Sequence, residues 1–188
     1  MNRLKRSIVF LYVSMTCFLV SGQVVTGTQL LWESNSLVLK NPAGKIVAEY
    51  AGKLGKPDSW VDARPLKIML FYKSYQRIEF LDHRLNRIGD AIFLPDVGIF
   101  QAQLACPSIQ NGVWIYDQTE HKVHFVDFKL RKRTSTLDIT LALSSGQFSV
   151  QEQPFSMKEE GNRLYLLYPQ GTIVIDRYGN FVKVISTK

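Results

Sequence analysis

The sequence repeats one pattern four times along its length. Each copy has a short apolar segment, a turn that opens with Asp or Asn, and a second short segment. The copies cover residues 35–47, 75–88, 121–133 and 170–182, with turns opening at Asn41, Asp82, Asp127 and Asp176. The turns are 41, 45 and 49 residues apart. The apolar segments are too short for helices and rich in β-branched and aromatic residues, so each copy predicts β-strands.

A repeat of about 40–50 residues made of short strands is typical of β-propeller blades. We therefore expect an all-β, β-propeller-like array of about four antiparallel blades over residues 24–58, 59–97, 98–150 and 151–188. The Asp or Asn that opens each turn can accept a hydrogen bond from the backbone two residues on. Gly44 and Gly179 suit a positive φ, whereas Leu85 and Leu130 stand in their place in the middle copies and predict longer or different turns.

The segments VIDRYGN (174–180) and LKNPAGK (39–45) resemble the strand–turn–strand of NHL-type and related β-propeller repeats. Those repeats have an apolar strand, Asp, two residues, Gly and a polar residue. The resemblance covers nearly all of the chain after its N-terminal segment. It implies the fold only, because the matching residues form turns and carry no chemistry to transfer.

The sequence offers little that would close a ring of blades. The last predicted strand ends next to Lys188, and residues 24–26 make a poor additional strand for the first blade. The alternatives are a small ring closed by residues 24–26, an open arc, and a ring whose remainder lies beyond Lys188. We favour an incomplete or open ring. Its exposed sheet edges would invite pairing with another chain or be covered by further residues.

Residues 1–22 have the layout of a cleavable secretion signal. Three basic residues at positions 3, 5 and 6 precede an apolar stretch at 8–20, and small residues follow at 21 and 22. The stretch is shorter than the ~20 residues that span a bilayer, which favours cleavage over the alternative of an uncleaved anchor. We therefore expect export to the periplasm or the periplasmic face of the outer membrane, with residues 23–188 forming the repeat domain.

Two cysteines are present, and we interpret Cys17 as an ordinary residue of the apolar stretch and not as a lipid acceptor. Cleavage would leave Cys106 alone, so no internal disulfide is expected. Its place in a predicted strand indicates a buried thiol.

The net charge is +7 for the whole chain, and the signal accounts for three of these charges, leaving +4. A moderate positive charge favours solubility and contact with an anionic surface, and export argues against nucleic acid. No later segment is apolar enough to cross a membrane as a helix. A basic run in the third copy predicts a surface for a partner or an anionic headgroup, the alternative being a solvated turn; its residues are Lys129, Arg131, Lys132 and Arg133.

Four charged residues are candidates for ligand binding at the mouth of the central channel. Asp58, Asp62 and Arg64 flank the predicted inner strand of the second blade, and Asp96 has a comparable place in the third. Paired carboxylates there would suit general acid–base chemistry, but sequence alone brings no two within reach. His83, His121 and His124 are expected to face solvent and hold no metal.

These features predict an exported, non-enzymatic binding or scaffold module in a cell-envelope protein complex. Its expected partner is an envelope or outer-membrane protein, and we expect no cofactor, no metal and no nucleic acid. The chain carries no phosphate-binding glycine loop, zinc-ligand spacing or nucleophile motif. The alternative is a propeller-fold glycan-binding protein, hydrolase or lyase with its site at the channel mouth, so enzymatic activity stays an open question.

Overall fold

The computed structural model describes residues 23–25, 27–63, 67–129, 132–140 and 152–186. The expected signal, Arg64 and Arg131 lie outside these ranges. The described strands form four sheets, each of four antiparallel strands. The first blade has β1 (Gln23–Val25), β2 (Thr28–Glu33), β3 (Ser36–Lys40) and β4 (Ile46–Tyr50). The second has β5 (Ser59–Asp62), β6 (Lys67–Tyr72), β7 (Arg77–Asp82) and β8 (Ile92–Phe93).

The third blade has β9 (Ala102–Ser108), β10 (Gly112–Asp117), β11 (Lys122–Asp127) and β12 (Lys132–Asp138). The fourth has β13 (Ser156–Glu160), β14 (Arg163–Tyr168), β15 (Gly171–Asp176) and β16 (Phe181–Ser186). One short 3₁₀ helix, η1 (Pro95–Val97), lies between β8 and β9. The order of strands within every sheet is their order along the chain.

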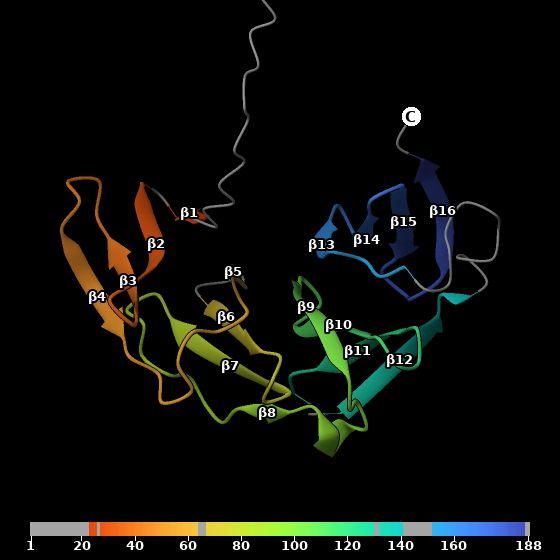
Figure 1. The fold of residues 1–188 in the computed structure, drawn as a ribbon, viewed down its shortest axis with the longest axis horizontal. Helices are drawn as coiled ribbons and strands as arrows, with labels where there is room; N and C mark the ends of the chain where they lie inside the picture. The colour runs from red at the N-terminus through yellow and green to blue at the C-terminus, as the bar shows by residue number, and fades with distance from the viewer. Residues whose placement is uncertain (1–22, 26, 64–66, 130–131, 141–151, 187–188) are drawn as a thin grey trace, which may run out of the picture.

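The four blades form an open arc, with the first strand of each blade on the inside and the first and fourth blades at its separated ends (Figure 1). The all-β fold, the four blades and the open ring predicted from the sequence are confirmed. Residues 23–25 do form a strand, but β1 pairs with β2 of its own blade, Val24 opposite Gln29.

In the two inner blades, alternating side chains pack against the blade before and the blade after. On β10, Val113 and Ile115 belong to the cluster shared with the second blade, whereas Trp114 and Tyr116 belong to the cluster shared with the fourth. A third cluster, with Leu37 and Leu70, joins the first and second blades. Because each fully buried large apolar side chain contributes about 1.5–3 kcal/mol, these three junctions hold the arc together.

The turns between the last two strands of a blade are built on one plan. The Asn41 side-chain Oδ1 accepts hydrogen bonds from the backbone N–H groups of Ala43 and Lys45, both at 3.0 Å. Asp82 Oδ1 accepts the equivalent bonds from Arg84 and Asn86, both at 2.8 Å. Asp176 binds Tyr178 and Asn180 in the same way, at 2.8 and 2.9 Å. The hydrogen bond expected from the residue two positions on is thus confirmed.

The prediction of a different turn at Leu85 is wrong. Leu85 adopts φ 63°, close to the 77° of Gly44 and the 88° of Gly179. The Leu85 side chain is only 3% exposed and belongs to the cluster between the first two blades. Its burial offsets the backbone strain of a positive φ, so the same turn forms without glycine. Leu130 lies outside the described residues.

Candidate functional site

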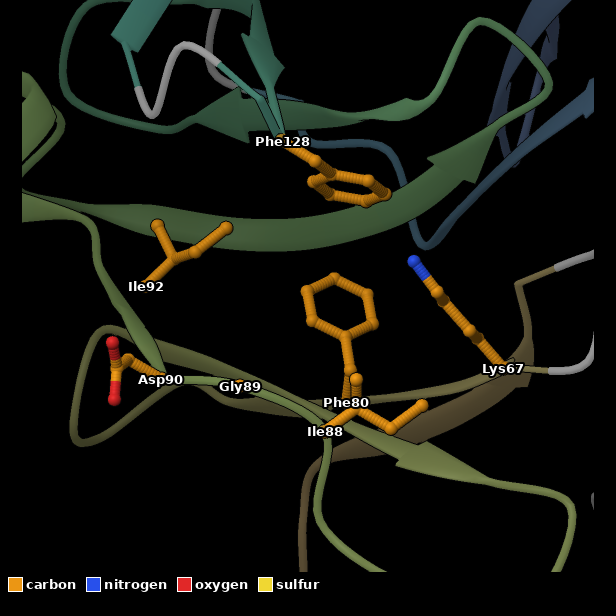
Figure 2. A pocket seen from close by; sticks show the side chains of 7 residues that line it. All are labelled: Lys67, Phe80, Ile88, Gly89, Asp90, Ile92 and Phe128. Carbon is orange, nitrogen blue, oxygen red and sulfur yellow. The ribbon is translucent and has the colours of Figure 1, made fainter.

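A small hollow of about 160 Å³ opens at the junction of the second and third blades. The phenyl rings of Phe80 and Phe128 line its middle, and Lys67 and Asp90 lie at its opposite ends (Figure 2). Its lining is formed by Lys67, Phe80, Ile88, Gly89, Asp90, Ile92 and Phe128.

Strand pairing explains why residues far apart in sequence meet here. Phe80 lies on β7 opposite Met69, on the face that packs against the third blade. Phe128 follows β11 and packs edge to face on Phe80, with ring centroids 4.7 Å apart and planes at 69°. The backbone N–H of Ile88 donates to the Phe80 carbonyl oxygen at 2.8 Å, which holds the 88–90 segment beside the ring.

The size of the hollow limits what it can hold. Sites for small-molecule ligands usually enclose about 300–1,000 Å³, whereas this one has about half the lower limit. An apolar or aromatic side chain from another molecule would fill it, and the Lys67 ammonium at its edge would attract an acidic neighbour.

The basic run predicted from the sequence lies next to the hollow. Lys129 follows Phe128 directly, is exposed, and donates its backbone N–H to Asp127 Oδ1 at 2.8 Å. Lys132 and Arg133 are exposed at the start of β12, and Arg133 Nη1 donates to the Gly98 carbonyl oxygen at 3.3 Å. Arg131 is outside the described residues.

The structure separates the carboxylates that sequence analysis grouped at the channel mouth. Asp58 precedes β5 and Asp62 ends it, so four residues of extended chain, about 13 Å, lie between them. Asp58 is exposed, and its Oδ2 accepts the backbone N–H of Lys73 at 2.7 Å. Asp96 is exposed in η1, in the connection equivalent to the one that holds Asp58. Asp62 instead lies at the end where the β5–β6 connection leads to Lys67.

Sequence reasoning missed a buried ionic cluster between the first and second blades. Glu79 is 3% exposed and pairs with Arg77 Nη2 at 2.5 Å, with Arg87 Nη2 3.6 Å away. The Tyr50 hydroxyl donates to Glu79 Oε2 at 2.7 Å across the junction. Burial, together with the nearby Glu79 carboxylate, raises the pKa of Tyr50 well above its ordinary value and that of Tyr72 to about 12. Both phenols therefore stay protonated, which suits a structural role and not a nucleophile.

The prediction that all three histidines face solvent is wrong for His124. His83 is exposed and His121 is half-buried, but His124 is fully buried on the face of β11 turned toward the second blade. Burial and the charge of Arg133 lower the pKa of His124 to about 4. The alternation of polar and apolar residues along β11 predicts that His124 faces solvent. The second blade covers that face in the fold, and one strand's sequence does not reveal the cover.

A half-buried carboxylate, Glu159, joins the third and fourth blades. Trp114 Nε1 donates to Glu159 Oε2 at 2.8 Å. Cys106 is 5% exposed beside them, and burial raises the pKa of its thiol to about 12, so the expected buried thiol is confirmed. Among the described residues no group of three or more His, Cys, Asp or Glu side chains is arranged to hold a metal ion. In the same part of the chain, no helix has the length and apolar character to cross a bilayer.

No protein-family model and no curated protein sequence matches this chain. Solved β-propeller structures do. A catalytically inactive virginiamycin B lyase from Staphylococcus aureus, with quinupristin, has 12% identity and a TM-score of 0.58, over 88% of this chain and 54% of that one. A streptogramin B lyase has 13% identity and a TM-score of 0.54, over 82% and 49%. Apo AztD from Citrobacter koseri has 14% identity and a TM-score of 0.57, over 89% and 46%.

The chain spans about half the length of these proteins. At such low identity the likeness extends to the fold and not to activity. The fold-level resemblance noted from the turn sequences is confirmed, and the chain has a β-propeller fold, present as an open arc of four blades.

Proposed function

We propose that this chain is an exported, non-enzymatic protein-binding module that acts in a complex of the cell envelope, in the periplasm or on the periplasmic face of the outer membrane. The observation that carries the proposal is the hollow of about 160 Å³ beside an exposed basic turn. Protein interfaces commonly centre on one anchor side chain in a small apolar hollow, and the volume here suits one such side chain. The signal-like residues 1–22 support export.

The lining of the hollow supports a partner with a particular chemistry. An apolar or aromatic side chain of the partner packs against Phe80 and Phe128. Acidic residues on either side of that anchor meet Lys67 and Lys129. Charges at the rim of an interface mainly raise the rate of association and fix its orientation, so the phenyl rings provide most of the affinity.

The experiment is affinity purification of the tagged full-length protein from cross-linked cell envelopes, followed by mass spectrometry. Lys129→Glu reverses the charge beside the hollow, and Lys53→Glu makes the same change at an exposed position in the connection between β4 and β5. We expect one envelope protein in stoichiometric amount with the native chain and with Lys53→Glu, and its loss with Lys129→Glu. Equal recovery with both variants, or no protein partner at all, would contradict the proposal.

One observation favours the alternative of a glycan-binding protein, hydrolase or lyase. Phe155 is 63% exposed and directly precedes the inner strand β13. Phe100 is 62% exposed and lies just before the inner strand β9. Exposed rings at a channel mouth can stack on sugars, and Asp58 and Asp96 lie in the connections on the same side. Binding or cleavage on a polysaccharide panel, abolished in Phe155→Ala and reduced in Asp58→Asn, would establish this function in place of the first.

A further inference from the structure

The two end blades of the arc keep the side-chain pattern of blades that have a neighbour. At each junction, one blade presents a face to the blade after it and receives a face from the blade before. Among the described residues, those on the forward face of the fourth blade and on the backward face of the first are part of none of the three core clusters. We call these the forward end face and the backward end face.

Repeat equivalence defines the forward end face. The turn residues Asp127 and Asp176 align the third and fourth blades, so Tyr165 and Leu167 on β14 correspond to Trp114 and Tyr116 on β10. Trp114 and Tyr116 are 1% and 0% exposed at their junction. Tyr165 and Leu167 are equally apolar but only half-buried, and Ile185 beside them is 45% exposed. The face is therefore built like a junction face that awaits a cover.

The backward end face has a matching apolar centre, in which Leu31 is half-buried and Val38 is only 2% exposed. Leu31 on β2 and Val38 on β3 are cross-strand partners, and they correspond to Leu70 and Glu79 in the second blade. At the first junction, Tyr50 contacts Glu79 through a hydrogen bond. The equivalent positions at the two ends of the arc are Ile185 and Val38. The positions of the hydrogen-bonded pair Tyr50 and Glu79 are thus taken by the apolar residues Ile185 and Val38 at the ends of the arc.

The charges around the two faces are complementary. On the backward end face Glu33 pairs with Lys40 at 2.6 Å, which leaves Glu49, opposite Val38, as the excess charge. On the forward end face Lys158 pairs with Glu160 at 3.0 Å, and two further basic residues, Lys183 opposite Val174 and Arg163 opposite Asp176, lie on the same face. Glu49 and Lys183 are both exposed on the outermost strands of their blades. Opposite charges in such positions favour one pairing of faces over like-with-like pairing.

We propose that a second copy of this chain covers both end faces, the forward face of each copy packing on the backward face of the other. A two-fold axis then closes both contacts at once, as in most symmetric dimers. This chain matches 46–54% of the length of the solved propellers, and two arcs paired in this way have about the length of one of them. The pairing also covers Ile46, which lies opposite Lys40 and is 47% exposed.

The test is the molar mass of the full-length exported protein, measured by light scattering during size-exclusion chromatography at micromolar concentration. We expect twice the mass of one chain. Ile185→Glu should shift the mass to one chain, whereas Ile109→Glu, at a 70% exposed residue in the β9–β10 turn away from both faces, should leave the dimer intact. Circular dichroism checks that every variant keeps its strands.

A charge swap separates this pairing from other dimers. Lys183→Glu and Glu49→Lys each place like charges at the contact and should raise the dissociation constant at least tenfold. The double variant restores opposite charges and should recover most of the affinity. The proposal would be overturned if the protein were a monomer at all concentrations or formed a series of higher oligomers. It would also be overturned if the double variant lost as much affinity as the two single variants together. The hollow lies at the second junction, so such a result would leave the proposed function standing.

Discussion

The side-chain amide of Gln76 makes two hydrogen bonds to the backbone of Ala102, donating from Nε2 to the carbonyl oxygen at 3.0 Å and accepting the N–H on Oε1 at 2.7 Å. Gln76 lies in the β6–β7 turn and Ala102 begins β9, so one side chain ties the second blade to the inner strand of the third. Ala102 is fully buried. The amide thus satisfies both backbone groups of a residue that water does not reach.

Replacing Gln76 with Ala should destabilise the chain by about 1–3 kcal/mol, because it leaves a buried N–H and a buried carbonyl unpaired. Urea unfolding followed by tryptophan fluorescence measures the change. Gln101→Ala, at an exposed glutamine, is the matched control and should stay within about 0.5 kcal/mol of the native chain. Equal stability of the two variants would show that the blades do not depend on this tie.

Leu85 should reverse the usual order of alanine and glycine substitutions. Leu85→Ala removes a buried side chain but keeps the strained φ of 63°, and should cost about 2–5 kcal/mol. Leu85→Gly removes the same side chain and relieves the strain, worth about 1–2 kcal/mol, so it should be no less stable than Leu85→Ala. At Leu81, buried in the same cluster on regular strand β7, glycine should be the worse of the two. Paired urea titrations of the four variants would reveal any other order.

Stability should fall with acidification because of His124. Its pKa is about 4 in the folded chain and near 6.5 when unfolded, so the unfolded state binds the extra proton between these values. The neutral ring therefore contributes its full stabilisation above pH 6.5, and about 3 kcal/mol is lost as the pH falls to 4.

His124→Gln should flatten the dependence of the unfolding free energy on pH in this window, whereas His83→Gln, at an exposed histidine, should leave the slope unchanged. Asp82 acts at lower pH. Hydrogen bonds from Asn86 hold the pKa of Asp82 below its ordinary value, so its contribution is present above about pH 4 and lost as pH falls through the folded pKa. If the unfolding free energy fell only below pH 4 and stayed constant above it, the role given to His124 would be contradicted.

Cys106 should be unreactive in the folded chain. Burial raises the pKa of its thiol to about 12, so at pH 8 almost no thiolate forms, and the sulfur is shielded from reagents. In a Cys17→Ser background, a coloured disulfide reagent should modify Cys106 at least a hundredfold faster in concentrated guanidinium than in buffer. Rapid labelling in buffer would mean that the junction between the third and fourth blades opens readily.

The sequence predicted those features that depend on neighbours along the chain. The Asp82 and Asp176 turns follow from local hydrogen bonding, and the strands flanking them follow from apolar runs. The residue pattern also predicts the fourth strand of the second blade at residues 87–92, whereas β8 is Ile92–Phe93 and an isolated bridge joins Leu81 to Arg87. That segment leaves the sheet early to line the hollow, and no local pattern encodes the departure.

Features that depend on a neighbouring blade were not predictable from one strand. Glu79 and His124 occupy polar positions of alternating strands, which indicates solvent exposure when a sheet has one open face. In this fold both faces of an inner blade are covered, so the same positions become buried and need ionic partners or a neutral ring. The hollow is equally hidden, because Phe80 and Phe128 meet only through the packing of two sheets.

Each blade is one uninterrupted stretch of chain, with its four strands paired in the order in which they occur. Nearly all strand pairings therefore join residues close in sequence, and the relative contact order is low for an all-β protein. Folding rates rise as contact order falls, because short loops cost little entropy to close. A chain that emerges from its N-terminus onward, as during synthesis or in the proposed export, is then able to complete each blade as that blade arrives, and each finished blade offers its forward face as a template for the next.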